Sequence, residues 1–284
     1  MAFRSLREGF LSIRRYPVIL LAGVAAGIPL ALTEFFMYSG MTHYGEASGF
    51  FGLLILPFFI AAGLGVIREK DGSLRTYFSQ GARHYFRVLL PAVGILLLAA
   101  LSAIIVMSVL SLAVGGVDPA FAAYGFLWVA IPLAFFFFWY DTAAVFEDIK
   151  LFASLSRSAQ FVLARPFKVF GFIIVGILLG FVIIVGLMII GSVFVAGSMT
   201  FDESLTVDQV LNMTPEEQEA LIGEEALFWF TMLYSIGVGL FTALLIPYKA
   251  AFYLRFAQEL PASGFGEPPV AGEYDEKGRW YKYS

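Results

Sequence analysis

The sequence predicts an all-α integral membrane protein with six transmembrane helices. The chain is 60% hydrophobic and only 14% charged, its mean hydropathy is +0.83, and its apolar residues gather in six long runs. A soluble domain of this composition would expose too much apolar surface. About 20 apolar residues cross a bilayer. The runs are 17–38, 50–67, 88–114, 121–146, 167–197 and 226–254.

The charge distribution gives these spans a direction. All 18 Lys and Arg residues fall on one side of the six-span topology, because the stretches 39–49, 115–120 and 198–225 contain neither residue. Short basic loops stay in the cytoplasm during insertion, so we expect a multi-pass protein of the cell membrane with both termini cytoplasmic. Orientation accounts for the basic residues, and no nucleic-acid partner is expected.

The first run, 17–38, follows four arginines and has some features of a signal peptide. Cleavage sites require small residues, but Glu34 and the bulky Phe35-Phe36-Met37 end this run. We therefore expect a retained membrane span.

The spans group into three units of two, about 1–69, 70–147 and 148–260. We expect three parallel repeats around an axis along the membrane normal. Each unit starts with a basic amphipathic segment, expected to be an interfacial helix. Each returning run carries a proline, which a helix bundle tolerates. These prolines are Pro57, Pro132 and Pro247.

Two small-xxx-small patterns lie in the outgoing runs, at Gly23–Gly27 in the first and Gly176–Gly180 in the fifth. Such patterns let helices approach closely. Internal packing is the expected use, and homodimerisation is the alternative.

The segment 198–225 is the one sizeable outer loop and carries eight acidic residues. Thr214 followed by Pro215 predicts a helix start. A solvated helix and a cap that binds cations or a partner both remain open. Asn212 lies in a glycosylation sequon on the correct side, but the sequence does not determine its modification. At the other end, 261–284 is expected to be a flexible cytoplasmic tail beyond the membrane domain 1–260.

Ionisable residues within the spans are the first candidates for a site. Asp141 in the fourth run and Lys249 in the sixth lie at similar depth with opposite charges, so we predict an ion pair that pins these spans together. Snorkelling to the interface is the alternative for both, and for Glu34. Anionic lipid headgroups are expected to contact basic residues at the inner interface. These are Arg14, Arg15, Arg83, Arg87, Arg165 and Lys168.

The sequence predicts no enzyme, no cofactor and no metal site. Cysteine is absent, and the topology places the two histidines, His43 and His84, on opposite sides of the membrane. The chain contains no HExxH, GxSxG, phosphate-loop or dinucleotide motif.

The middle of the chain resembles a known family. The residues that carry the resemblance are Asp141-Thr-Ala-Ala-Val-Phe-Glu147, Leu155-Ser-Arg157-Ser158, Phe161 and Arg165-Pro-Phe-Lys-Val-Phe-Gly171. Over these roughly 30 residues the chain resembles the membrane domain of some glycerophosphodiester phosphodiesterases and related uncharacterised bacterial and archaeal membrane proteins. The resemblance implies a helical membrane domain. It does not imply phosphodiesterase activity, because the sequence contains no such catalytic domain.

The favoured interpretation is a non-enzymatic scaffold or accessory subunit that interacts with membrane lipids or a protein partner. A transporter or channel for a small molecule or lipid is the first alternative, and a membrane anchor for a separate soluble enzyme is the second. The sequence also leaves open whether the chain forms a homo-oligomer.

Overall fold

The computed structural model describes residues 2–114, 119–195, 214, 224–257, 272–274 and 280–282. Six of its helical segments are long and apolar enough to cross a membrane, and each overlaps one predicted run. The predicted class, an all-α membrane protein with six spans, is therefore confirmed. The elements are α1 (Ala2–Arg15), a 3-10 turn (Pro17–Ile19), α2 (Leu20–Tyr38), α3 (Thr42–Glu69), α4 (Leu74–Val114), α5 (Pro119–Phe137), α6 (Tyr140–Phe146), α7 (Leu151–Ala164), α8 (Pro166–Val195), α11 (Glu224–Ala257), β1 (Gly272–Tyr274) and β2 (Trp280–Lys282).

Two predicted features fall largely outside the described residues. In the outer loop 198–225, only Thr214 and the start of α11 are described, so Asn212 and the helix expected to begin at Pro215 lie outside them. In the tail 261–284, the described residues are those of β1 and β2. These two strands pair antiparallel, with Glu273 opposite Tyr281.

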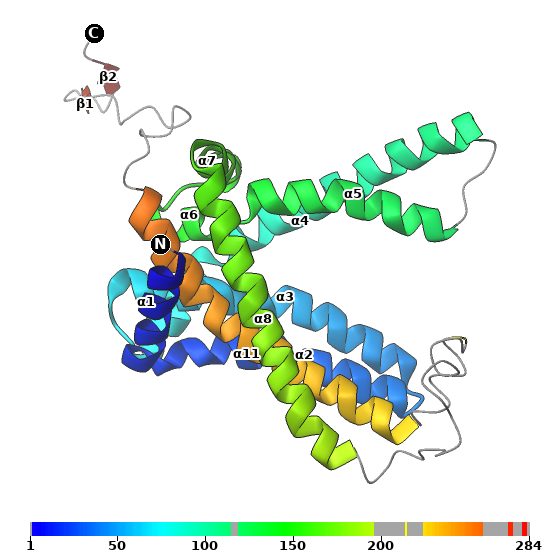
Figure 1. Ribbon diagram of the computed structural model, residues 1–284. Helices are drawn as coiled ribbons and strands as arrows, with labels where there is room; N and C mark the ends of the chain where they lie inside the picture. The colour runs from blue at the N-terminus through cyan, green and yellow to red at the C-terminus, as the bar shows by residue number, and fades with distance from the viewer. Residues whose placement is uncertain are drawn as a thin grey trace.

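Helix α11 is the hub of the bundle. It packs against α1, α2, α3 and α8, whereas α5 packs against α4 and α7. In Figure 1, α2, α3, α8 and α11 extend together, while α4 and α5 form a hairpin that diverges from them. The bundle is thus joined at one end and opens toward the other.

The buried core lies at the joined end. One cluster is aromatic and includes Trp139, Phe161, Phe172 and Phe252. The second gathers Ile19, Leu64, Tyr77, Val88 and Ile246 with several buried alanines. Large side chains farther along α4 and α8 are mostly exposed, as expected for helices that face lipid.

The three units start differently. Helices α1 and α7 end before Pro17 and Pro166, respectively. Residues that precede proline avoid the helical conformation, and Tyr16 (φ −130°) and Arg165 (φ −143°) are indeed non-helical. The second unit has no proline at this junction, so its amphipathic segment 73–87 continues into the span as one helix, α4. The three-fold repeat stays a prediction.

The fourth span, predicted as one run over 121–146, is interrupted between α5 and α6. Backbone groups freed inside a membrane helix need other partners. Ser158 of α7 supplies them: its Oγ accepts a hydrogen bond from the Trp139 N–H (3.0 Å) and donates one to the Phe136 carbonyl (2.8 Å). Helix α7 therefore fixes the position of the interruption.

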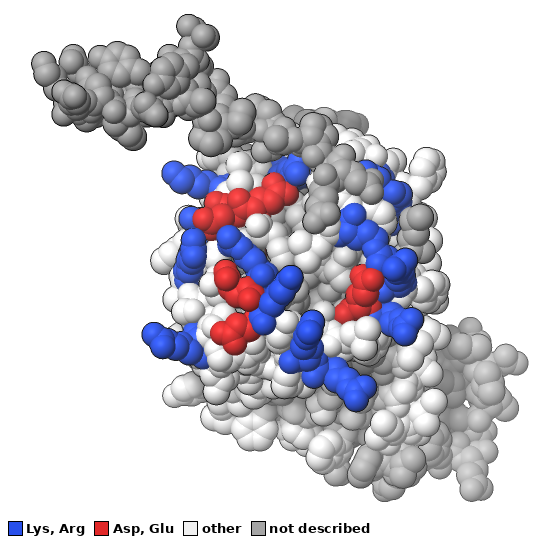
Figure 2. Space-filling view, turned by 90° about the vertical axis from the view of Figure 1, so that its left-hand side faces the viewer, with Lys and Arg blue, Asp and Glu red and all other residues white. Residues whose placement is uncertain are grey.

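Basic side chains gather on the face at the joined end, which we call the basic face. Figure 2 shows Lys and Arg spread over it, with acidic side chains among them. It is formed by α1, the α3–α4 turn, the α6–α7 turn, α7 and the end of α11.

Candidate functional site

An apolar groove of about 730 Å³ runs between α8 and α11. On α8 it extends from Phe172 to Met188, which is about 24 Å at 1.5 Å per residue. On α11 it extends from Phe230 to Leu245. The Tyr234 hydroxyl is the one polar side-chain group among the lining residues. The groove can therefore hold an apolar chain but offers little to a polar solute.

Glycines explain why the groove is open. Gly176 and Gly180 both line it, and a Cβ added at Gly176 would meet nothing within 4 Å. The predicted small-xxx-small pattern on α8 thus leaves volume between the helices instead of bringing them together. The other pattern behaves as expected for internal packing: a Cβ at Gly27 would lie 2.9 Å from the Ser235 carbonyl oxygen, so α2 and α11 touch backbone to backbone.

An aromatic wall closes the groove near the basic face. Phe138 and Phe172 line this end. The Phe172 ring stacks on Tyr248 with centroids 4.2 Å apart, and the Tyr248 hydroxyl donates to the Phe172 carbonyl (3.2 Å). The Lys249 ammonium lies 4.2 Å from the centroid of Phe138.

The structure brings together Asp141 and Lys249, the two residues predicted to pair. Lys249 Nζ lies 2.6 Å from Asp141 Oδ1, and both side chains are buried. The same oxygen accepts hydrogen bonds from the Thr142 N–H (2.6 Å) and hydroxyl (3.1 Å). The pair joins α6 to α11 beside the aromatic wall. Glu34 lies apart from it, near the other end of α2.

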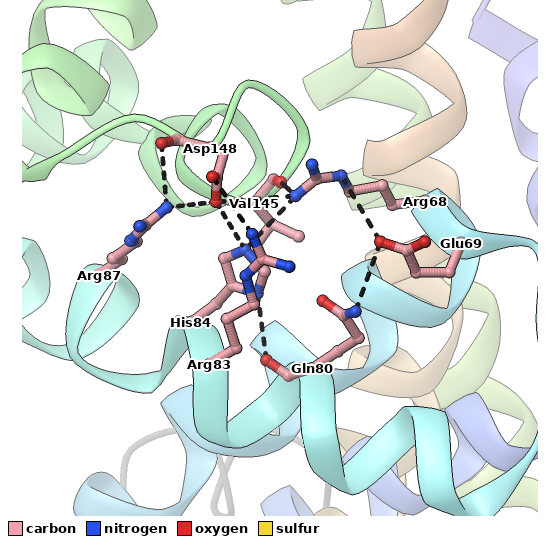
Figure 3. A network of polar contacts seen from close by, with 8 residues as sticks. All are labelled: Arg68, Glu69, Gln80, Arg83, His84, Arg87, Val145 and Asp148. Carbon is pink, nitrogen blue, oxygen red and sulfur yellow. Dashed lines mark hydrogen bonds and ion pairs between the residues drawn. The ribbon is translucent and has the colours of Figure 1, made fainter. Parts of the chain in front are cut away.

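A second polar site surrounds Asp148 in the α6–α7 turn (Figure 3). Its Oδ1 accepts a hydrogen bond from His84 Nε2 (3.2 Å) and another from Arg87 Nη1. Arg83 Nη2 lies 3.5 Å from Oδ2, and Arg68 Nη1 lies 3.8 Å from Oδ1. We call Arg68, Arg83, His84, Arg87 and Asp148 the Asp148 cluster.

Backbone contacts and electrostatics hold this cluster in place. Arg68 donates to the Val145 carbonyl (2.8 Å), and Arg87 donates to the Asp148 carbonyl (2.9 Å). Partial burial would raise the pKa of Asp148, but the His84 hydrogen bond and the charges of Arg87 and Arg83 together lower it. Asp148 is therefore a stable carboxylate at neutral pH.

The preceding residue, Glu147, points its carboxylate elsewhere. Its Oε1 accepts hydrogen bonds from Arg157 Nε (2.9 Å) and from the Tyr253 hydroxyl (2.5 Å). Burial would lower the pKa of Arg157, but the hydrogen bond and charge of Glu147 raise it. The two neighbouring acids thus connect α6 to different helices: Glu147 to α7 and α11, and Asp148 to α3 and α4.

The six arginines and lysines predicted to contact headgroups all lie at the joined end of the bundle. Arg83 and Arg87 belong to the Asp148 cluster. Lys168 places its ammonium 4.3 Å from the Phe256 ring centroid, and Arg165 lies over the same ring. Arg14 and Arg15 are the basic residues in the last turn of α1, which packs on α11 with Gly9 against the backbone of Tyr248.

The sequence did not indicate that Arg68, His84 and Asp148 belong to one site. The available signal was the pair Glu147-Asp148, two adjacent acids in an otherwise basic segment. The α8–α11 groove was also not predicted. In the described part of the chain, no group of three His, Asp or Glu residues is placed to hold a metal ion.

Comparison with known proteins gives one match. A family model described as a domain of unknown function (DUF7847) matches residues 1–256. The chain belongs to this family. No curated protein and no solved structure matches it. The DUF7847 domain begins with α1 and ends within the last turn of α11, so it contains the groove, the Asp148 cluster and the Asp141–Lys249 pair.

Proposed function

We propose that this DUF7847 protein is a non-enzymatic membrane protein that binds lipid, acting as a scaffold or accessory subunit. The observation that carries the proposal is the apolar groove along α8 and α11. A void in a bilayer loses dispersion contacts on its lining, so the groove must hold an apolar occupant. Its length of about 24 Å suits an extended acyl chain inside a hydrocarbon core of about 30 Å.

The lining favours a lipid chain over a helix of another protein. Helix interfaces in membranes are rich in small residues. Here the small residues are Gly176, Gly180 and Gly237, and the other lining residues are aromatic or aliphatic. Such side chains adapt to a flexible acyl chain. The same lining argues against a path for a polar solute, so in the transporter alternative the cargo is lipid or another apolar molecule.

The charge of the basic face supports an orientation in which this face and the N-terminus lie on the cytoplasmic side of the cell membrane. Lys and Arg are retained on that side of a membrane. The exposed aromatic side chains of α1, Phe3 and Phe10, suit an interfacial helix whose arginines reach anionic headgroups. An anchoring role for a separate enzyme would use this face as well.

The groove is tested by filling it. We expect Gly176→Leu to remove co-purified lipid, because a side chain at this position enters the groove without meeting other atoms. Gly186→Leu is the matched control: it lies on the same helix, also faces open space, and does not line the groove. The measurement is native mass spectrometry of the full chain extracted mildly from its membrane.

Three results would count against the proposal: no lipid on the wild-type protein, equal lipid on both variants, or loss of a second protein chain instead of lipid in Gly176→Leu. The last result would make the groove a helix-binding surface.

A further inference from the structure

The Asp148 cluster, even with the neighbouring Glu69, holds more positive charge than its carboxylates neutralise. Three guanidinium groups converge here, from Arg68, Arg83 and Arg87 (Figure 3). Asp148 faces all three, and Glu69 adds one contact to Arg68 at 3.9 Å. Two carboxylates therefore face three guanidinium groups, which leaves one positive charge in excess even if His84 is neutral.

Arg83 and Arg87 also keep hydrogen-bond donors available. A guanidinium carries five N–H donors. Among the described residues, the contacts of Arg83 use Nη2 alone, and those of Arg87 use Nη1 alone. The two residues are four apart on α4 and so share one face. Their side chains are 54% and 31% exposed, so a further acceptor can reach both.

The position of the pair suits a ligand at the membrane surface. Arg87 follows Tyr85 and Phe86, and Phe86 is 63% exposed. Aromatic residues are enriched at the headgroup level of membranes. The N–H groups of an arginine guanidinium fit the spacing of phosphate oxygens. The hydrogen bonds that they donate are charge-assisted and stronger than those of neutral donors.

We propose that Arg83 and Arg87 form a phosphate-group site, and that the Asp148 carboxylate is its built-in competitor. Asp148 occupies donors that the phosphate would otherwise use, and its charge weakens the attraction of the site for anions. The ligand is the headgroup of an anionic phospholipid or a free phosphate, since both carry the same chemistry. The site lies on α4 and the α6–α7 turn, away from the α8–α11 groove, so it stands independently of the lipid occupancy proposed there.

The test uses the full chain in detergent micelles. Its thermal unfolding midpoint is followed while phosphatidic acid, phosphatidylcholine or inorganic phosphate is added, because a ligand that binds the folded state raises that midpoint. We expect phosphatidic acid to act and phosphatidylcholine not to. Arg83→Gln should weaken the apparent affinity about tenfold, the equivalent of one charge-assisted hydrogen bond. Its contact with Asp148, at 3.5 Å, is weak, so its loss leaves the fold intact.

Matched variants separate a site from a general charge effect. Arg75→Gln removes an exposed arginine of α4 outside the cluster and should leave the affinity unchanged. Asp148→Asn should tighten binding, whereas Glu46→Gln, at the far end of the bundle, should not.

A response to phosphatidic acid alone identifies a lipid headgroup as the ligand, and a response to inorganic phosphate as well identifies a site that is open to water. Equal losses in Arg83→Gln and Arg75→Gln, or no response to either phosphate, would overturn the site. Weaker binding by Asp148→Asn would overturn the role of Asp148.

Discussion

At the scale of single residues, the ion pair of Asp141 and Lys249 is where we expect a single substitution to destabilise the protein most. Both side chains are buried, and Lys249 has its Phe138 ring contact besides the carboxylate. Removing one partner of a buried pair leaves the other charge without compensation, whereas removing both avoids this penalty.

We therefore expect Lys249→Met alone to lower the free energy of unfolding by about 3–5 kcal/mol. The double variant Asp141→Asn/Lys249→Met should lose clearly less. Denaturant unfolding in detergent measures both, with Glu46→Gln as an exposed control that should match the wild type. A double variant at least as unstable as the single one would show that the pair does not hold α6 against α11.

Asp148 gives a residue-level prediction about pH. Because its pKa in the folded protein is lowered from 3.8, its carboxylate stabilises the fold above that value, and the stabilisation is lost as pH falls through the lower, folded-state pKa. The unfolding midpoint of Asp148→Asn should lie below that of the wild type at pH 7, and the difference should shrink only once the pH falls below 3.8. Thermal scans of both proteins between pH 7 and pH 3 measure this, and a difference that stays constant would contradict it.

Part of the candidate site could be predicted from the sequence, and part could not. Asp141 and Lys249 were predictable because opposite charges in apolar runs are rare, and their depths can be counted along the helices. Asp148 was not, because its partners lie 61 to 80 positions away on α3 and α4, and its left-handed backbone (φ 55°) turns the side chain toward them. Nothing in the local sequence specifies that direction.

At the scale of elements, the contact of α2 with α11 depends on glycine. A Cβ at Gly239 would lie 2.8 Å from the Gly23 carbonyl oxygen, and Gly23 faces Gly239 in return. We expect Gly23→Ala to destabilise the protein by about 1–3 kcal/mol, because it forces two backbones apart. The matched change Gly94→Ala, where a Cβ meets nothing, should be neutral or stabilising. Denaturant unfolding in detergent measures the free energy of unfolding of both variants. Equal effects of Gly23→Ala and Gly94→Ala would contradict the close approach of α2 and α11.

The helices themselves were largely predictable, and their interruptions were not. Apolar runs of sufficient length locate all six spans, since a bilayer demands that length. The break before α6 depends on a serine of α7, a tertiary contact. The continuity of α4 followed from the absence of a proline at Phe86-Arg87-Val88, whereas Pro17 and Pro166 interrupt the other two units.

At the scale of the whole molecule, the basic face makes the proposed orientation testable. The chain contains no cysteine, so single cysteines can be introduced without background. A membrane-impermeant maleimide should label Tyr44→Cys on intact cells, and Lys150→Cys only after permeabilisation. Tyr44 is exposed at the end of the bundle opposite the basic face, and Lys150 is exposed in the α6–α7 turn. The reverse pattern would invert the topology.

The adjacent acids of the α6–α7 turn, Glu147 and Asp148, limit how much the length of this turn can vary among members of the family. Turns between helices usually accept insertions, because little depends on their register. Here Glu147 reaches Arg157 and Tyr253, while Asp148 reaches Arg87 and His84. One inserted residue would turn one carboxylate away from its partners. Members of this family should therefore gain and lose residues in other connections, and keep this one at a constant length.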